Sequence, residues 1–280
     1  MRKTLIPYLR CTAGCDSDLQ LFADAPAGDV SIETGYLQCS CGRKYSIESG
    51  IVRMLPAELE ASTETSACDE SVLRKHSEIK ARDAQVEDYD RMWYLTLFGK
   101  IEIPFTLRRL NLHPDSILLE GGCGTGRMTQ EFAARCERLI SLDFSWESLR
   151  SNAFKLRTAG VTNVDLIQAD LCNLPLKSEV FNRVVSCQVL EHIPSMECRG
   201  SAVSELNRVM RQDGRLVISA YRHSLITRCF GEKEGEHAGG IYFFRFARHE
   251  LHELLSQHLT VNEISGAMVY HFTASCCKTR

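Results

Sequence analysis

A glycine-rich turn after an apolar run that ends on an acid is the part of the sequence best suited to bind a ligand. Residues 116–126 read SILLEGGCGTG, with Glu120 at the end of the run, followed by Gly122, Gly124 and Gly126. The run predicts a buried parallel strand, and the turn predicts the entry to a helix. Glycine has no Cβ atom to keep a ligand away from the backbone. Because Glu120 can accept hydrogen bonds from an ammonium group, the turn favours a cationic amino-acid cofactor.

The spacing of these glycines separates two classes of cofactor. The dinucleotide fingerprint G-x-G-x-x-G uses the same kind of turn. Here the spacing is G-x-G-x-G, and Arg127 stands where the third dinucleotide glycine would fall. The turn therefore favours S-adenosylmethionine over a dinucleotide.

Two further acids follow predicted strands. Asp143 ends the apolar run 139–143, where a carboxylate can accept hydrogen bonds from both ribose hydroxyls of a nucleoside. Asp170 follows the predicted strand 164–168 and could accept from an adenine amino group, with Leu171 packing on the ring. One such acid could equally be a solvated strand end or a helix cap. Three acids in order after a glycine turn predict a single nucleoside site.

Alternating strands and helices must position these side chains. Beyond the strand at 116–120, strands are predicted at 139–143, 164–168, 182–187 and 215–220, helices at 128–136, 146–159, 199–211 and 247–257, and final antiparallel strands at 259–265 and 268–274. This alternation predicts an α/β fold with a doubly wound, Rossmann-like sheet that is mostly parallel, its last strand antiparallel. Such sheets bind ligands at the carboxyl ends of their strands, where all three acids fall.

Residues of about 78–265 resemble a class I S-adenosylmethionine-dependent methyltransferase, close to the branch called methyltransferase type 11. The matching motifs are LLEGGCGTGR (118–127), SLDFS (141–145), QADLCNLPL (168–176), SCQVLEHIP (186–194) and ELNRVMRQDGRLVIS (205–219). Gly121 departs from the family pattern, in which an aliphatic residue is usual. The resemblance implies that the cofactor is held by Glu120, Gly122, Gly124, Gly126, Asp143, Phe144, Asp170, Leu171 and Gln188.

The resemblance also implies the chemistry. Methyl transfer from a sulfonium is an in-line displacement in which the cofactor supplies the reactive group and the protein aligns donor and acceptor. A general base is needed only when the acceptor atom holds a proton. The candidate catalytic residues are His192, His223 and His237. For His192 the alternative is a structural role under the cofactor loop.

Two segments are candidates for the walls of an acceptor pocket. Residues 221–246 mix glycine, charged and aromatic residues, as a substrate loop does, although a surface loop or an extra hairpin would have the same composition. Residues 82–94 are helical in pattern, and the resemblance implies a lid with Tyr89 and Trp93 facing the pocket. The alternative is a helix that only buttresses the sheet.

A small cysteine-containing module precedes this region. Cys11 and Cys15 form a C-x3-C pair, and Cys39 and Cys41 form a C-x-C pair. Four thiolates brought together would hold a structural Zn²⁺, which replaces the core that so short a segment can scarcely build. The segment that follows, 42–56, resembles the zinc-ribbon-like module of a small activator of eukaryotic methyltransferases, and one fused to a bacterial rRNA guanine methyltransferase. The alternative is a β module whose cysteines no longer bind metal.

Composition shifts suggest where the domains end. We predict a zinc-ribbon-like module at 1–57, a linker at 58–77 whose first part is rich in Ser, Thr and Glu, and a methyltransferase domain at 78–280. Thirteen cysteines without a secretion signal predict a cytoplasmic protein. No apolar stretch is long enough to span a membrane, so no membrane partner is expected.

Charge favours one class of acceptor. The net charge of the chain is −3, and the first 57 residues hold as many acidic as basic side chains, so no electrostatic footprint for nucleic acid is present. We therefore expect methyl transfer to an oxygen, nitrogen or carbon atom of a small molecule. The alternative is an rRNA base methyltransferase that recognises RNA through its zinc ribbon. A binding protein on an inactive fold would have lost the three acids. The acceptor and the oligomeric state do not follow from the sequence.

Overall fold

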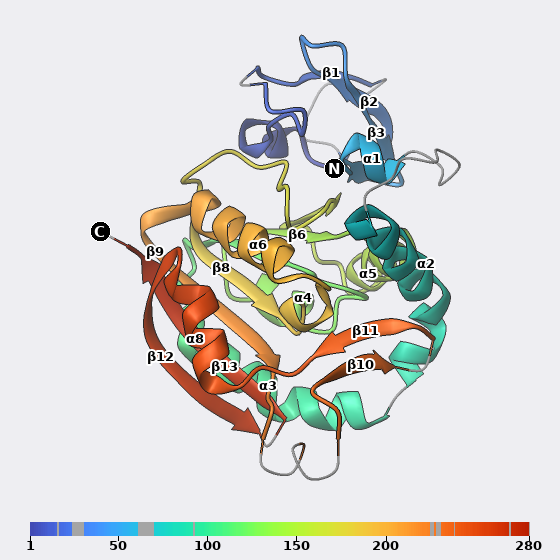
Figure 1. Ribbon diagram of the computed structural model, residues 1–280. Helices are drawn as coiled ribbons and strands as arrows, with labels where there is room; N and C mark the ends of the chain where they lie inside the picture. The colour runs from blue at the N-terminus through green and yellow to red at the C-terminus, as the bar shows by residue number, and fades with distance from the viewer. Residues whose placement is uncertain are drawn as a thin grey trace.

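The fold was analysed in a computed structural model that describes residues 1–15, 17–23, 31–60, 70–91, 93–224, 227, 231–237, 239–268 and 270–279. The side chains of 88–98, 267 and 268 lie outside this description. Within the described ranges, eleven strands form one sheet in the order β1-β2-β3-β4-β7-β6-β5-β8-β9-β13-β12, and β10 and β11 form a separate hairpin (Figure 1).

The centre of the sheet has the predicted parallel strands. They are β5 (Ile117–Gly121), β6 (Arg138–Asp143), β7 (Val164–Gln168), β8 (Phe181–Cys187) and β9 (Met210–Tyr221). The chain runs from β5 outward to β6 and β7, then returns to β8 and β9 on the other side. The order reverses beside β5, which is the position where ligands bind in such sheets. The antiparallel strands β13 (His271–Lys278) and β12 (Leu259–Met268) complete this end. The predicted α/β fold class is confirmed.

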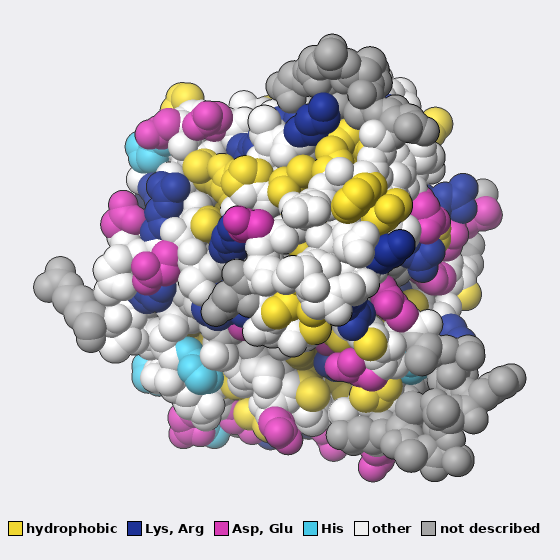
Figure 2. Space-filling model, turned by 90° about the horizontal axis from the view of Figure 1, so that it is seen from above, with side chains coloured by type: hydrophobic (Ala, Val, Ile, Leu, Met, Phe, Trp, Pro, Cys, Tyr) yellow, Lys and Arg dark blue, Asp and Glu magenta, His cyan; other side chains and the backbone are white. Residues whose placement is uncertain are grey.

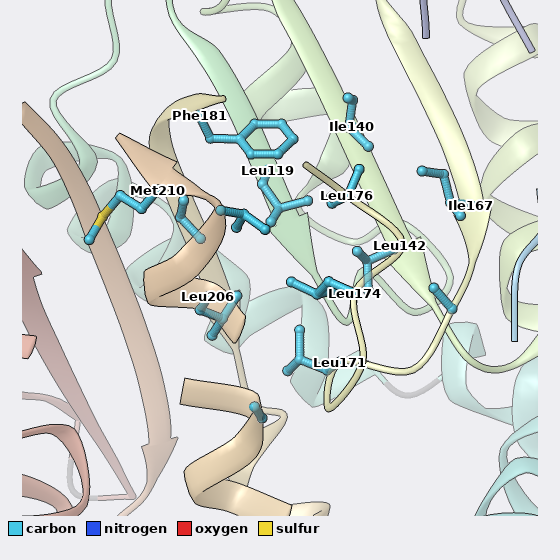
Figure 3. Packing of buried hydrophobic residues seen from close by; sticks show 14 of the residues in the cluster. Leu119, Ile140, Leu142, Ile167, Leu171, Leu174, Leu176, Phe181, Leu206 and Met210 are labelled. Atoms are coloured by element: carbon cyan, nitrogen blue, oxygen red, sulfur yellow. The ribbon is translucent and has the colours of Figure 1, made fainter. Parts of the chain in front are cut away.

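Alternation of apolar side chains along the strands produces two buried layers. Leu118 of β5 and Val185 of β8 pack with Leu110 and Phe132 on one face. That face is covered by α3 (Trp93–Leu110), α4 (Thr129–Ala133) and α5 (Trp146–Thr158). The next residues along the strands, such as Leu119, pack on the opposite face against α6 (Met196–Val209) and α8 (Arg248–Ser256). Figure 3 shows Leu119, Ile140, Phe181, Leu206 and Met210 in this second layer.

Several helix ends differ from the prediction. The helix expected at 199–211 starts three residues earlier, because Ser195 accepts a hydrogen bond from the backbone N–H of Cys198 and caps it. It ends at Val209, since Met210 already pairs with Phe181 as the first residue of β9. The described helices contain no segment long and apolar enough to cross a membrane.

The N-terminal module shares the sheet of the core. Its elements are η1 (Lys3–Tyr8), β1 (Gln20–Phe22), β2 (Thr34–Gln38), β3 (Lys44–Glu48), β4 (Ile51–Arg53) and α1 (Ala57–Glu60). β4 pairs in parallel with β7, with Val52 opposite Ile167. Leu37 and Tyr45 belong to the same apolar cluster as Leu119. The module lies at one end of the molecule in Figure 1, and the sheet runs through the boundary predicted at residue 57.

Helical structure enters the predicted linker from both ends. Helix α1 extends to Glu60, and α2 (Glu70–Arg91) begins within the segment 58–77. Residues 61–69 lie outside the described part of the chain. The linker prediction underestimated the helical content of 70–77, where Leu73, Arg74 and Lys75 are good helix formers.

The shared sheet predicts that the module and the core unfold together. Leu37 is fully buried, so Leu37→Ala should lower the free energy of unfolding by about 2–5 kcal/mol. In a Trp93→Phe background the remaining tryptophan, Trp146, lies in the core helix α5 and reports on the core. Its fluorescence and far-UV circular dichroism should shift together in urea. The exposed Phe154→Ala is the control. A lower midpoint by circular dichroism alone would contradict the shared sheet.

Candidate active site

The predicted cofactor residues meet around one cavity at the carboxyl ends of the parallel strands. The cavity has a volume of about 420 Å³. Ten of the predicted site residues line it, namely Glu120, Gly122, Gly124, Asp143, Phe144, Asp170, Leu171, Gln188, His192 and His237. Within the described residues, Gly126 and His223 are not part of this lining. The volume falls in the range of small-molecule and cofactor sites.

Glu120 is buried at the end of β5. The hydroxyls of Thr129 and Ser141 both donate to its Oε2 atom at 2.8 Å. Burial raises the pKa of the carboxyl to about 7, because two hydrogen bonds replace only part of its hydration. A cationic group placed beside Glu120 would therefore complete a charge pair, which no basic side chain among the described residues forms with it at ion-pair distance.

Asp143 ties the glycine turn to the end of β6. The backbone N–H of Gly124 donates to its Oδ2 at 2.8 Å, and that of Ser145 to its Oδ1 at 2.9 Å. Burial raises the pKa of this carboxyl as well, despite the two donors. The carboxylate thus fixes the position of the turn and also faces the cavity, where contact with ribose stays a prediction.

The three predicted glycines have different structural reasons. All have positive φ, which L side chains rarely adopt. A Cβ atom on Gly122 would lie 2.2 Å from Val189 Cγ2, and one on Gly126 would lie 2.2 Å from Asn152 Oδ1. These two glycines therefore permit close packing within the protein. Only Gly124 of the three has open space where its Cβ would be, so the expected role in ligand approach applies to Gly124.

Helix α2 covers the edge of the cavity at Asp170. Lys75 Nζ lies 2.6 Å from Asp170 Oδ2, while the backbone N–H of Cys172 donates to Oδ1. Burial alone would lower the pKa of Lys75, but the adjacent carboxylate outweighs it and the pKa is raised. Asp83, also on α2, accepts from the Ser145 hydroxyl at 2.6 Å and from the backbone N–H of Glu147. Helix α2, whose residues 82–91 belong to the segment predicted as a lid, is thus fixed at the second strand end through Asp83 and at the third through Lys75.

Glu102 is a buried residue of the site that sequence reasoning missed. It accepts from Arg127 at 2.9 Å, from Gln188 Nε2 at 2.6 Å and from the Ser219 hydroxyl at 3.1 Å. Burial by itself would raise the pKa of Glu102, but these partners hold it below its ordinary value. Its signal was a lone acid between Ile101 and Ile103 in an apolar helix. Glu102 orients Arg127 and Gln188, which both line the cavity.

The histidines define the other side of the cavity. His192 Nδ1 lies 2.7 Å from the carbonyl oxygen of Tyr242, which only an N–H can satisfy, so Nε2 carries the lone pair. Burial keeps the pKa of His192 well below its ordinary value, and the ring is neutral. His237 packs on Phe243 with ring centroids 4.5 Å apart, and burial lowers its pKa too. The backbone N–H of His223 donates to Phe246 outside the lining.

A hairpin forms this wall. β10 (Glu234–His237) and β11 (Ile241–Phe244) pair within the segment expected as a substrate loop or hairpin. Arg199, which is almost fully buried on α6, anchors it. Its guanidinium donates to Tyr242 Oη at 3.1 Å and lies 4.3 Å from the centre of the Phe244 ring. The side chains of Tyr89 and Trp93, predicted for a second wall of the pocket, lie outside the described residues.

The four predicted zinc ligands come together in the module. The Sγ atoms of Cys11, Cys15, Cys39 and Cys41 all lie within 4.8 Å of one another. The Cys11 and Cys41 sulfurs are 3.8 Å apart. Zinc–sulfur bonds of about 2.3 Å in a tetrahedron place sulfurs about 3.8 Å apart. The Cys11–Cys41 pair matches this spacing, and the Cys15–Cys39 pair is shorter, at 3.1 Å. The short C-x-C pair is accommodated because Gly42 has a φ of 90° and its N–H bonds to the Cys39 carbonyl.

Comparison with known proteins agrees with this geometry. Residues 119–218 match a family described as "Methyltransferase domain". The demethylmenaquinone methyltransferase of Thermobifida fusca is 29% identical over 118 residues, 42% of this chain and 49% of that protein. The protein-L-isoaspartate O-methyltransferase of Nitrobacter winogradskyi is 30% identical over 138 residues, 45% of this chain and 63% of that one. The chain spans about half the length of the curated relatives it matches first.

Solved structures share the fold. The 1,6-didemethyltoxoflavin-N1-methyltransferase of Burkholderia thailandensis, solved with S-adenosylhomocysteine, superposes with a TM-score of 0.63 at 16% identity, covering 89% of this chain and all of that chain. An S-adenosylmethionine-dependent methyltransferase of Clostridium acetobutylicum gives 0.56 at 14% identity, covering 69% and 97%. The chain therefore shares the Rossmann-like fold of these structures, and its residues 119–218 match the methyltransferase family model.

The raised pKa of Glu120 predicts a pH-dependent stability. Between pH 4.5 and about 7 the folded state binds more protons at this group than the unfolded state, so its contribution falls as pH rises. Glu120→Gln removes this pH-dependent loss of stability and keeps a hydrogen-bond acceptor for the hydroxyls of Ser141 and Thr129. The free energy of unfolding of the variant minus that of wild type should increase by roughly 2–3 kcal/mol when the pH is raised from 5 to 8. Urea unfolding measures this, and a pH-independent difference would contradict it.

Proposed function

We propose that this protein transfers a methyl group from S-adenosylmethionine to a small molecule. The observation that carries the proposal is the meeting of Glu120, Asp143 and Asp170 around one cavity beside the open Gly124. Glu120 would hold the ammonium group, Asp143 the ribose hydroxyls and Asp170 the adenine amino group. The bound cofactor would supply an electrophilic methyl group.

We propose further that the acceptor atom carries a proton, as a hydroxyl or an N–H group does. His192 lines the cavity, burial lowers its pKa, and its hydrogen bond through Nδ1 to the Tyr242 carbonyl leaves the Nε2 lone pair to accept a proton. Such a group can accept the proton that the acceptor loses. Tyr221, His237 and Ile241 surround it and offer ring and aliphatic surfaces. The Thermobifida and Burkholderia relatives are named for small ring-containing substrates, which supports the same class.

The alternative substrate, an rRNA base, has less support. Four of the six basic side chains of the module are engaged with acids, as Arg2 with Asp165 and Arg10 with Glu205 illustrate. On the face that Figure 2 shows, acidic and basic side chains are interspersed. An RNA-binding surface requires basic groups that are free to neutralise phosphates. Salt-dependent binding of rRNA fragments would favour this alternative.

We also propose that the four cysteines bind one structural Zn²⁺. The clustering of four thiols within 4.8 Å supports this proposal, and Tyr45 contacts the cluster from within the module core. Its hydroxyl lies 3.0 Å from Cys11 Sγ and accepts the backbone N–H of Thr12 at 2.8 Å. Such outer partners orient metal ligands in known sites.

Cofactor binding is tested with S-adenosylhomocysteine by isothermal calorimetry. Asp143→Ala should weaken binding by about 10- to 100-fold, because two hydrogen bonds to a charged group are lost. Asp143→Asn retains one acceptor oxygen and serves as a control variant that preserves the fold. Glu137→Gln changes an exposed acid outside the cavity lining and should leave affinity unchanged. Equal affinity for wild type and Asp143→Ala would refute the ribose contact, and no binding to wild type would refute the cofactor proposal.

Zinc is tested by native mass spectrometry of protein purified without added metal. We expect one zinc ion per chain. Cys41→Ser, at the exposed corner of the cluster, should weaken zinc retention by at least tenfold, since serine is a poor zinc ligand. Cys277→Ser, a partly exposed cysteine outside the cluster, is the matched control. A metal-free wild-type protein that does not take up added zinc would show the cluster to be a remnant.

A further inference from the structure

A segment of the N-terminal module runs beside the loop that follows β7. Leu9 bridges Leu176 in antiparallel fashion. The backbone N–H of Lys177 donates to the Tyr8 carbonyl at 2.8 Å, and that of Arg10 to the Pro175 carbonyl at 3.0 Å. Residues 8–12 and 173–177 therefore form a two-stranded contact across a sequence separation of more than 160 residues.

Side chains reinforce this contact. Arg10 Nε donates to the Leu174 carbonyl at 3.0 Å, and its Nη2 donates to Glu205 Oε2 at 3.0 Å. The same Glu205 oxygen accepts the backbone N–H of Leu174 at 2.8 Å. Asn173 Nδ2 donates to the Thr12 carbonyl. The loop is thus held between the module and α6, with Arg10 at the junction.

The loop held in this way is the one that carries the third acid of the cavity. Asp170, Leu171 and Cys172 line the cavity immediately before residues 173–177. Leu171 and Leu174 pack in the same buried layer (Figure 3). Because the loop is short and anchored at its distal end, movement at Leu174 would move Asp170 as well.

A second contact holds the start of the loop. The backbone N–H of Met54 donates to the Gln168 carbonyl at 2.8 Å, and Arg53 Nε donates to Gln168 Oε1 at 3.0 Å. Gln168 Nε2 in turn donates to the carbonyl of Phe144, another lining residue. The module therefore forms hydrogen bonds with the cavity loop on both sides of Asp170.

Cys11 lies between Arg10 and Thr12, in the middle of the first contact. We propose that the module is a clasp for the cofactor site. Metal binding at the four cysteines fixes the conformation of residues 8–12, and Arg10 in turn holds the loop that carries Asp170 in position. Arg10 is a positioning residue, since it touches the loop and not the cavity. This inference rests on the proposed binding of S-adenosylmethionine and zinc, and gives the module a role inside the enzyme that needs no nucleic acid.

The test measures S-adenosylhomocysteine affinity of the full chain by calorimetry, before and after zinc is removed with a chelator. We expect zinc removal to weaken binding at least about fivefold, with recovery when zinc is restored. Arg10→Gln should weaken it by a similar factor while all four cysteines remain. Asp18→Asn is the matched control, because it removes an exposed ion pair with Lys177 at the outer edge of the same interface. Its affinity should equal that of wild type.

Hydrogen exchange at 170–177 supplies a readout that needs no ligand. Exchange there should accelerate in Arg10→Gln and in the chelated protein, and stay unchanged in Asp18→Asn. Unaltered exchange and affinity in a folded Arg10→Gln protein, with a normal melting temperature, would overturn the clasp. If wild type failed to bind S-adenosylhomocysteine, the proposed function would fall while exchange still decided the clasp. If it held no zinc, unchanged exchange on addition of zinc would overturn the metal-dependent part.

Discussion

Buried carboxylates at the carboxyl ends of parallel strands are the constraint on which the site depends. Removing a carboxylate from water is unfavourable unless donors replace its hydration. Glu120 finds two hydroxyls, and Asp143 finds two backbone N–H groups. Burial nevertheless leaves the pKa of both raised. A ligand with a cationic group beside Glu120 and hydroxyl groups beside Asp143 would stabilise the charged form of both carboxylates.

Two other acids, at or beside the cavity, have their charge balanced by side chains of the protein. Asp170 is paired with Lys75 from α2, and Glu102 with Arg127 and Gln188. Lys75 links α2 to the third strand end, so a ligand that engages Asp170 must share it with a cation. Glu102 satisfies its charge within the protein and serves to orient its neighbours. Asp170 and Glu102 thus have a cationic partner within the protein, whereas Glu120 and Asp143 could gain one from a ligand.

Two histidines line the side of the cavity proposed for the acceptor, within reach of the charge of Arg82. His192 lies on a short helical turn, η2 (Leu190–His192), and His237 lies on the anchored hairpin. Their rings are 6.1 Å apart, and each contacts Tyr221, at centroid distances of 5.5 and 5.9 Å. Burial lowers the pKa of both histidines, so neither adds positive charge next to a cationic methyl donor. This arrangement suits the proposed cofactor, whose positive charge Glu120 and Asp143 would stabilise.

The sequence alone determined the features that are local. Apolar runs that end on Glu120 and Asp143, and a third that is followed by Asp170, predicted the parallel strands and the edge at which they meet, because side-chain periodicity and glycine punctuation depend on neighbouring residues. Paired cysteines indicated the cluster. Only the tertiary structure decided that the module extends the central sheet, that Glu102 and Arg199 are buried supports, and which nitrogen of His192 bonds to the Tyr242 carbonyl. Each of these depends on a partner distant in sequence, and no local pattern encodes that partner.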